Sequence, residues 1–248
     1  MGLFSRRKKN MNSQFAMPAL RLQTDFHSHI LPGIDDGAQT VDESIEMLKE
    51  FVNQGYNKLI TTPHIHTLRY KNTIESINKS FNILKEEMIN QNINIDLQFA
   101  AEYYVDNEFV KLIKEDQILS TSDFNYVLIE FAFQMPPIGT AKIFNLLQEK
   151  SYNPIIAHPE RYEYWNGNLS LFSKLKDQGF LFQGNLLSAN GGYGPNAQRN
   201  FEMLANNNMY DFLGSDAHDA ESVKEINEII KLPIVQKVIL NGINNHSL

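Results

Sequence analysis

The feature of this sequence that most constrains its fold is a regular alternation of short β-rich segments with amphipathic helical segments along almost the whole chain. Seven strand-then-helix units in series predict a parallel sheet, because parallel neighbours need a crossover connection of this length. The strands are predicted at residues 20–26, 58–62, 95–101, 126–129, 153–157, 180–185 and 210–214, and the helices at 41–55, 73–91, 107–114, 140–150, 169–178, 196–207 and 221–230.

The 248-residue chain is predicted to form one domain after a short arm. No Pro/Ser-rich linker divides it, and a single α/β barrel commonly has this length. The domain is expected over residues 21–248, with a short apolar tail at 235–240. Residues 1–20 contain the basic cluster RRKK without the apolar stretch of a secretory signal, so a flexible basic arm is predicted. The alternative is transient contact with anionic lipid or with an acidic partner.

Composition excludes several classes of protein. The chain is 42% hydrophobic and 21% charged, as expected of a globular protein, and no apolar run approaches the roughly 20 residues that span a bilayer. A net charge of -7 argues against nucleic-acid binding. The absence of cysteine excludes disulfides and a thiol nucleophile. A cytoplasmic location is the default expectation. A position peripheral to the inner membrane would depend on a membrane-bound partner.

The stretch DFHSHILPGIDDG, residues 25–37, contains the first candidate metal ligands. On a strand, residues two apart point to the same face, so His27 and His29 can present both imidazoles to one ion. A Pro/Gly turn then leads to Asp35 and Asp36. Asp35 is expected to orient a ligand or to cap the turn.

Further polar residues lie at or just after the ends of the later predicted strands. Taken singly, each is more often a structural residue than a ligand. In an open sheet only strands near the switch point share a site, whereas in a barrel the carboxyl ends of all strands meet at one mouth. A closed barrel with one polar mouth therefore explains the placement of His64, Glu102, Glu130, His158, Asp216 and His218.

Charge supports a metal site. Four carboxylates in one cavity, those of Asp36, Glu102, Glu130 and Asp216, would repel each other, and at least one would be neutralised. Three divalent cations would bring about six positive charges, leaving a surplus of about two that matches a phosphate dianion. Mixed imidazole and carboxylate ligands suit Mn, Fe or Zn.

The motifs HSHILPGIDDG, TTPH, AAEYY, YVLIEF, IIAHPERY and GSDAH, in this order, resemble those of the PHP (polymerase and histidinol phosphatase) superfamily. Within it, the chain is most similar to the bacterial manganese-dependent tyrosine-protein phosphatases of capsule and exopolysaccharide operons. The resemblance implies a distorted (β/α)7 TIM-like barrel with three divalent metal ions, most often Mn, at the C-terminal mouth of the strands.

The resemblance also implies a distribution of ligands over the three ions. The first ion would be held by His27, His29, Glu102 and Asp216, the second by Glu102, Glu130 and His158, and the third by Asp36, His64 and His218. Arg161, in HPERY, matches an arginine that binds the substrate phosphate. A second family arginine, beyond the DxH motif, has no counterpart in DAHDAESV, and Arg69 is the candidate replacement.

The implied function is hydrolysis of phosphotyrosine in proteins by metal-activated hydroxide, regulating capsule or exopolysaccharide synthesis. Arg161 would contact the phosphoryl oxygens, and His66 and Asp219 are candidate acids for the leaving group. Two alternatives stay open: histidinol phosphate or another small phosphomonoester as substrate, and a phosphate-binding module without turnover. The implied partner is a membrane-associated tyrosine autokinase; no nucleic-acid partner is expected, and the oligomeric state is open.

Overall fold

The computed structural model describes residues 22–121 and 124–248. The predicted basic arm, residues 1–20, lies outside the described residues. The described strands form two sheets in which every pairing is parallel, as predicted. The first sheet has the order β1 (Thr24–Asp25), β2 (Lys58–Thr61), β4 (Asp96–Phe99); the second has the order β3 (His64–Ile65), β5 (Glu102–Tyr104), β6 (Tyr126–Glu130), β7 (Asn153–Ala157), β8 (Leu181–Asn185), β9 (Phe212–Gly214).

The described part of the chain has nine strands where seven were predicted, because two predicted strands are each followed by a break and a second short strand. Backbone hydrogen bonds continue across the breaks: Ala100 N donates to Thr61 O, and Glu102 N donates to Pro63 O. On the opposite side, a parallel bridge joins Ser28, after β1, to Ala217, after β9. Backbone pairing therefore continues from one sheet toward the other along these two chain segments, and the segments that follow β1 and β9 also pair.

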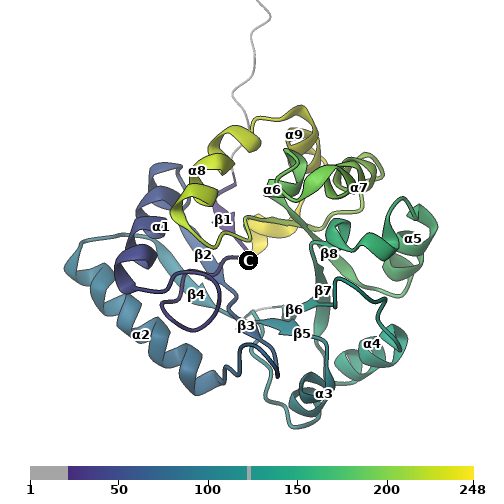
Figure 1. Ribbon diagram of the computed structural model, residues 1–248, viewed down its shortest axis with the longest axis horizontal. Coiled ribbons are helices and arrows are strands. Elements are labelled where there is room, and N and C mark those ends of the chain that lie inside the picture. The colour runs from purple at the N-terminus through teal and green to yellow at the C-terminus, as the bar shows by residue number, and fades with distance from the viewer. Residues whose placement is uncertain (1–21, 122–123) are drawn as a thin grey trace, which may run out of the picture.

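The helices lie around the outside of the strands (Figure 1). The predicted capping box is confirmed, since Thr40 Oγ1 accepts from Glu43 N and Glu43 Oε2 accepts from Thr40 N. The segment expected as an apolar tail is a helix, and a short helix after β8 was not predicted. The helices are α1 (Val41–Asn53), α2 (Ile74–Asn90), α3 (Asn107–Lys114), α4 (Thr140–Glu149), α5 (Leu169–Asp177), α6 (Leu186–Ala189), α7 (Gly194–Asn206), α8 (Ala220–Ile229) and α9 (Pro233–Leu240).

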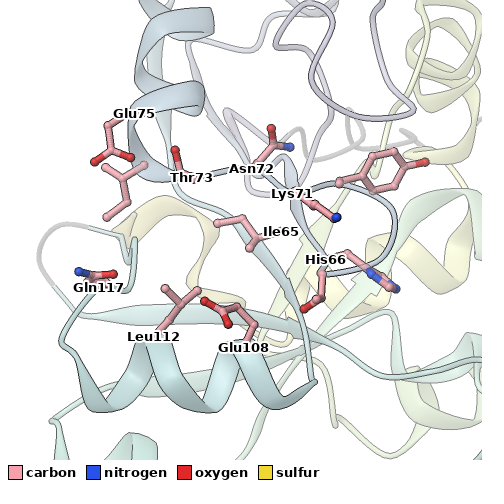
Figure 2. A pocket seen from close by; sticks show the side chains of 12 residues that line it. Ile65, His66, Lys71, Asn72, Thr73, Glu75, Glu108, Leu112 and Gln117 are labelled. Atoms are coloured by element: carbon pink, nitrogen blue, oxygen red, sulfur yellow. The ribbon is translucent and has the colours of Figure 1, made fainter.

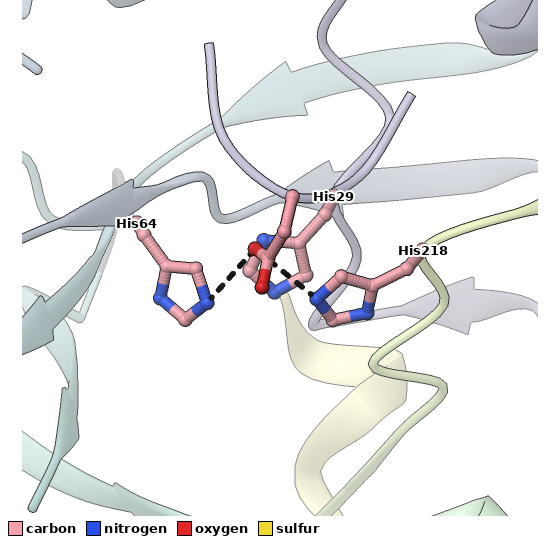
Figure 3. A group of neighbouring side chains, drawn as sticks. His29, His64 and His218 are labelled. Atoms are coloured by element: carbon pink, nitrogen blue, oxygen red, sulfur yellow. Dashed lines mark ion pairs between the residues drawn. The ribbon is translucent and has the colours of Figure 1, made fainter. Parts of the chain in front are cut away.

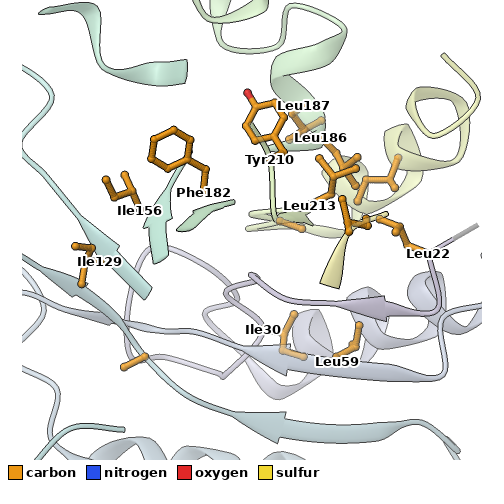
Figure 4. Packing of buried hydrophobic residues seen from close by; sticks show 14 of the residues in the cluster. Leu22, Ile30, Leu59, Ile129, Ile156, Phe182, Leu186, Leu187, Tyr210 and Leu213 are labelled. Carbon is orange, nitrogen blue, oxygen red and sulfur yellow. The ribbon is translucent and has the colours of Figure 1, made fainter. Parts of the chain in front are cut away.

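Alternate residues of the strands enter two separate apolar clusters. Leu59, Ile129, Ile156 and Leu213 belong to the larger cluster (Figure 4). Their neighbours in sequence belong to a smaller one, which consists of Phe26, Ile60, Ala100, Leu128, Ile155, Ala157 and Phe212. Because successive strand residues point to opposite faces, the strands have one face in each cluster.

None of the helices in residues 22–121 and 124–248 combines the length and the apolar character that a bilayer crossing requires.

Candidate metal centre

The candidate ligands converge at the carboxyl ends of the strands, where parallel α/β folds place their sites. His64 and Glu102 lie just past the carboxyl ends of β2 and β4, where they begin the short strands β3 and β5, and Glu130 ends β6. The remaining candidates lie in the segments that follow β1, β7 and β9. His27, His29, Glu102, Glu130, His158 and Asp216 are all buried, whereas His64 and His218 are half-buried.

Glu102 lies at the centre of this cluster. Its Oε2 is 3.1 Å from His27 Nε2 and 3.2 Å from His64 Nδ1, and its Oε1 is 3.2 Å from His158 Nε2. The side chain is fully buried, and both of its oxygens lie within 3.2 Å of imidazole nitrogens. A buried carboxylate surrounded by imidazoles has the chemistry of a metal ligand, so this position fits a shared metal ligand.

Potential ligand atoms fall into three overlapping groups, with all atoms of a group within 4.8 Å of one another. The first group holds the four residues expected to share one ion. In the second, Asp36 Oδ1 lies 3.5 Å from both His64 Nε2 and His218 Nε2, with His29 between them (Figure 3). The three groups are His27, His29, Glu102 and Asp216; His29, Asp36, His64 and His218; and His64, Glu102 and Glu130. The second group adds His29 to the set expected for the third ion. The third group has His64 in place of His158 in the set expected for the second ion, although His158 Nε2 is only 3.7 Å from Glu130 Oε1.

Electrostatics within the cluster demand positive charge. Burial alone lowers the pKa of His27, but the charges of Glu102 and Asp216 outweigh burial and raise this pKa to about 10. Burial and the neighbouring Glu102 raise the pKa of Glu130 well above its usual value. Burial and the charge of Arg161 lower the pKa of His158 to about 4, which keeps its imidazole neutral. Divalent cations would replace the protons that His27 and Glu130 otherwise hold.

The candidate ligands His27 and His29 are oriented by a second set of polar contacts. The expectation is that Asp35 orients a ligand or caps the turn. Its Oδ1 accepts from Gly37 N, which caps the turn, and its Oδ2 lies 2.9 Å from Nδ1 of the candidate ligand His29. Gln183 Oε1 lies 2.8 Å from His27 Nδ1. Both imidazoles thus have Nδ1 occupied and Nε2 directed at the cluster, where His27 Nε2 and His29 Nε2 are 3.3 Å apart.

Arg161 is fixed beside the cluster by charge and by two aromatic rings. Its Nη1 donates to Asp216 Oδ2 at 2.7 Å. Its guanidinium carbon lies 3.8 Å from the ring centroid of Tyr193 and 4.9 Å from that of Phe133. Asn185 Nδ2 also donates to Asp216 Oδ2. The guanidinium is therefore held at the edge of the cavity while its side chain stays partly exposed.

A cavity of about 190 Å³ opens over this centre, and Arg69 and His66 line it together with Arg161. Arg69 is exposed and makes no hydrogen bond or ion pair with another described residue. His66 stacks on Tyr104 with ring centroids 4.0 Å apart, and its Nδ1 accepts from Leu68 N. Asp219 is not among the described residues that line the cavity, because its Oδ1 caps α8 by accepting from Ser222 N.

Sequence reasoning missed three residues that shape this centre: Gln183, Asn185 and Tyr193. Asn185 ends β8, so the strand-end argument that found the carboxylates applied to it as well. Tyr193 lies in the GGYGP segment, whose glycines indicate a turn, and nothing in the sequence pointed to a role for its ring. Gln183 lies inside a strand and carried no signal.

Known proteins are similar to this chain in sequence. The family described as capsular polysaccharide synthesis, CpsB/CapC, matches residues 23–232. Tyrosine-protein phosphatase YwqE of Bacillus subtilis (strain 168) is 34% identical over 198 residues, which are 80% of this chain and 78% of YwqE. Tyrosine-protein phosphatase CpsB of Streptococcus agalactiae is 31% identical over 140 residues, covering 56% of this chain and 57% of that protein.

Solved structures extend the likeness. One comes from a study of YwqE from Bacillus subtilis and CpsB from Streptococcus pneumoniae, described as unique metal-dependent tyrosine phosphatases. It superposes with a TM-score of 0.76 at 32% identity and covers 84% of this chain and 85% of that chain. Histidinol phosphate phosphatase from Lactococcus lactis, at 13% identity and a TM-score of 0.54, covers 85% of this chain and 93% of its own and shares the fold. The chain belongs to the CpsB/CapC family of capsular polysaccharide synthesis proteins.

Proposed function

We propose that this chain is a metal-dependent protein-tyrosine phosphatase that regulates capsule or exopolysaccharide synthesis. The observation that carries the proposal is the overlap of three ligand groups around the buried carboxylate of Glu102, directly beside Arg161. The relatives that match most of the chain are named for this activity. The sequence has no cysteine, so hydrolysis proceeds without a cysteinyl-phosphate intermediate.

Three divalent ions, most often Mn, are proposed for the centre, with Fe and Zn as alternatives. His27, His29, Glu102 and Asp216 would hold the first, Glu102, Glu130 and His158 the second, and Asp36, His64 and His218 the third. Bound there, divalent ions lower the pKa of water toward about 7 and polarise phosphoryl oxygens.

The chain's own residues then position the substrate. Arg161 presents its guanidinium at the edge of the cavity, where it can make paired hydrogen bonds to two phosphoryl oxygens. Arg69 is proposed as the second, weaker phosphate contact, because it lines the same cavity and has no other described partner. A tyrosyl leaving group has a conjugate pKa of about 10 and needs less help from an acid than a serine alkoxide. His66 stays the candidate acid, since it lines the cavity, and Asp219 is the weaker one because it caps α8.

The two sheets are proposed to form one closed, distorted (β/α)7 barrel within a single PHP domain over residues 21–248. Support comes from the backbone pairing that continues across the breaks after β2 and β4, from the bridge between the segments that follow β1 and β9, and from the smaller apolar cluster, to which most strands contribute one face. The proposed substrate is a phosphotyrosine protein, with a membrane-associated tyrosine autokinase as the physiological candidate.

Phosphate release from a phosphotyrosine peptide in the presence of manganese tests the proposal, with a phosphoserine peptide and histidinol phosphate assayed beside it. We expect the phosphotyrosine peptide to have the highest kcat/KM. His27→Ala and Glu102→Ala should each lose far more than tenfold, while Glu149→Ala, at an exposed position on α4, serves as the matched control. A loss of less than tenfold in either site variant, or a preference for histidinol phosphate, would contradict the proposal.

A further inference from the structure

A second hollow, of about 530 Å³, lies beside the metal centre. It is bounded by β3, the start of α2 and one side of α3 (Figure 2). In that view His66 stands at one end, Glu75 and Gln117 stand at the other, and Ile65 and Leu112 lie between them. None of the candidate metal ligands lines it.

The hollow and the metal-site cavity share a wall. His66 and Tyr70 line both of them. These two residues are joined by a pair of backbone hydrogen bonds, from His66 N to Tyr70 O at 2.8 Å and from Tyr70 N to His66 O at 3.0 Å. A short hairpin, residues 66–70, therefore separates the two spaces, and a bound peptide that crosses this hairpin reaches both of them.

Size and lining distinguish the two spaces. At about 190 Å³ the metal-site cavity is smaller than the roughly 300–1,000 Å³ of pockets that enclose a whole ligand, whereas the hollow lies within that range. Ile65, Ile74 and Leu112 give the hollow apolar surface, and charges are present at Lys71, Glu75 and Glu108. Such a surface suits an apolar side chain better than a second phosphate, because two of the three charges are negative.

We propose that this hollow binds an apolar side chain of the substrate protein, one that lies next to the phosphotyrosine in sequence. The inference rests on the proposed function, because it assumes that a phosphotyrosine occupies the adjoining cavity. The hollow then selects among phosphotyrosine sites by their neighbouring residues, while the metal centre and Arg161 recognise only the phosphorylated ring.

Steady-state kinetics on phosphotyrosine peptides tests the selectivity. Peptides that differ at the positions flanking the phosphotyrosine, with Leu, Ala or Asp at each in turn, are compared with free phosphotyrosine. We expect Leu to be preferred over Ala by about tenfold in kcat/KM at one flanking position or more, and Asp to be the poorest. Equal kcat/KM values for all peptides would overturn the inference while leaving the proposed function intact.

A variant that fills the hollow tests whether the peptide selectivity arises there. Glu108→Trp, on the side of α3 that faces the hollow, should lower by about tenfold the ratio of kcat/KM for the Leu peptide to kcat/KM for free phosphotyrosine. The lost ion pair with Lys111 is exposed and contributes little. Lys114→Trp, on the same helix but outside the lining, should leave the ratio unchanged. A partly unfolded variant lowers both activities together, so an unchanged ratio in Glu108→Trp would refute the assignment. If the wild-type protein hydrolyses no phosphotyrosine compound, the proposed function fails first.

Discussion

Replacing Tyr193 tests whether an aromatic ring holds Arg161, the proposed phosphate-binding arginine, in place. The guanidinium carbon of Arg161 is 3.8 Å from the Tyr193 ring centroid, and the Arg161 side chain is 20% exposed. Cation–π contacts contribute from about 0.5–1 kcal/mol when exposed to about 2 kcal/mol when desolvated, and this one lies toward the desolvated end. At about 1.4 kcal/mol per factor of ten, a loss of about 1–2 kcal/mol predicts a decrease in kcat/KM of about 5- to 30-fold for Tyr193→Ala.

Tyr193→Phe is the matched control. It keeps the ring and removes only the hydroxyl, which lies 3.5 Å from Asp216 Oδ2, so we expect a decrease of less than about threefold. The assay is kcat/KM on a phosphotyrosine peptide with manganese, together with the inhibition constant of inorganic phosphate, which should rise by a similar factor in the alanine variant. Thermal unfolding checks that both variants fold. A Phe variant as deficient as the Ala variant, or an Ala variant within threefold of wild type, would refute the reasoning.

Two further predictions concern the cluster itself. Manganese should raise the unfolding temperature of the wild-type protein, because a ligand at 100 times its Kd stabilises the native state by about 2.7 kcal/mol. The Glu102→Gln variant should lose most of this rise. An equal rise in both proteins would show that Glu102 binds no ion. Gly37→Ala should lower the free energy of unfolding, measured by urea denaturation, by about 3 kcal/mol or more, because the new Cβ would lie 1.9 Å from His29 O. Gly139→Ala, whose Cβ meets nothing within 4 Å, should lose only about 1–2 kcal/mol through its positive φ, and equal losses at the two sites would contradict the prediction.

The sequence predicted those parts of the molecule that depend on local pattern. Helix α3 and strand β7 have the predicted bounds, because capping residues and apolar runs mark them. The breaks after β2 and β4 could not be predicted, since they depend on how neighbouring strands bend to continue the pairing at Ala100 and Glu102.

For the centre, the strand-end argument located the titratable candidates, because charged residues at such positions are conspicuous in a sequence. Gln183 and Tyr193 are neutral and act only through the residues that the fold places against them, His27 and Arg161. Their roles depend on contacts across long sequence separations, for which a single sequence carries no periodic signal.

The carboxylate of Asp216 contacts both the proposed cation-binding side and the proposed anion-binding side of the cavity, which couples the two sides thermodynamically. Its Oδ1 lies 3.2 Å from both His27 Nε2 and His29 Nε2, while its Oδ2 accepts from Arg161. The backbone of Asp216 lies in the left-handed region, at a φ of 51°. Its one carboxylate contacts both the imidazoles and the guanidinium, so the place of this side chain affects both. Linkage then requires that phosphate raise the affinity for manganese by the same factor as manganese raises the affinity for phosphate. Calorimetric titration of each ligand with and without the other measures the two factors, and affinities independent of the other ligand would exclude the coupling.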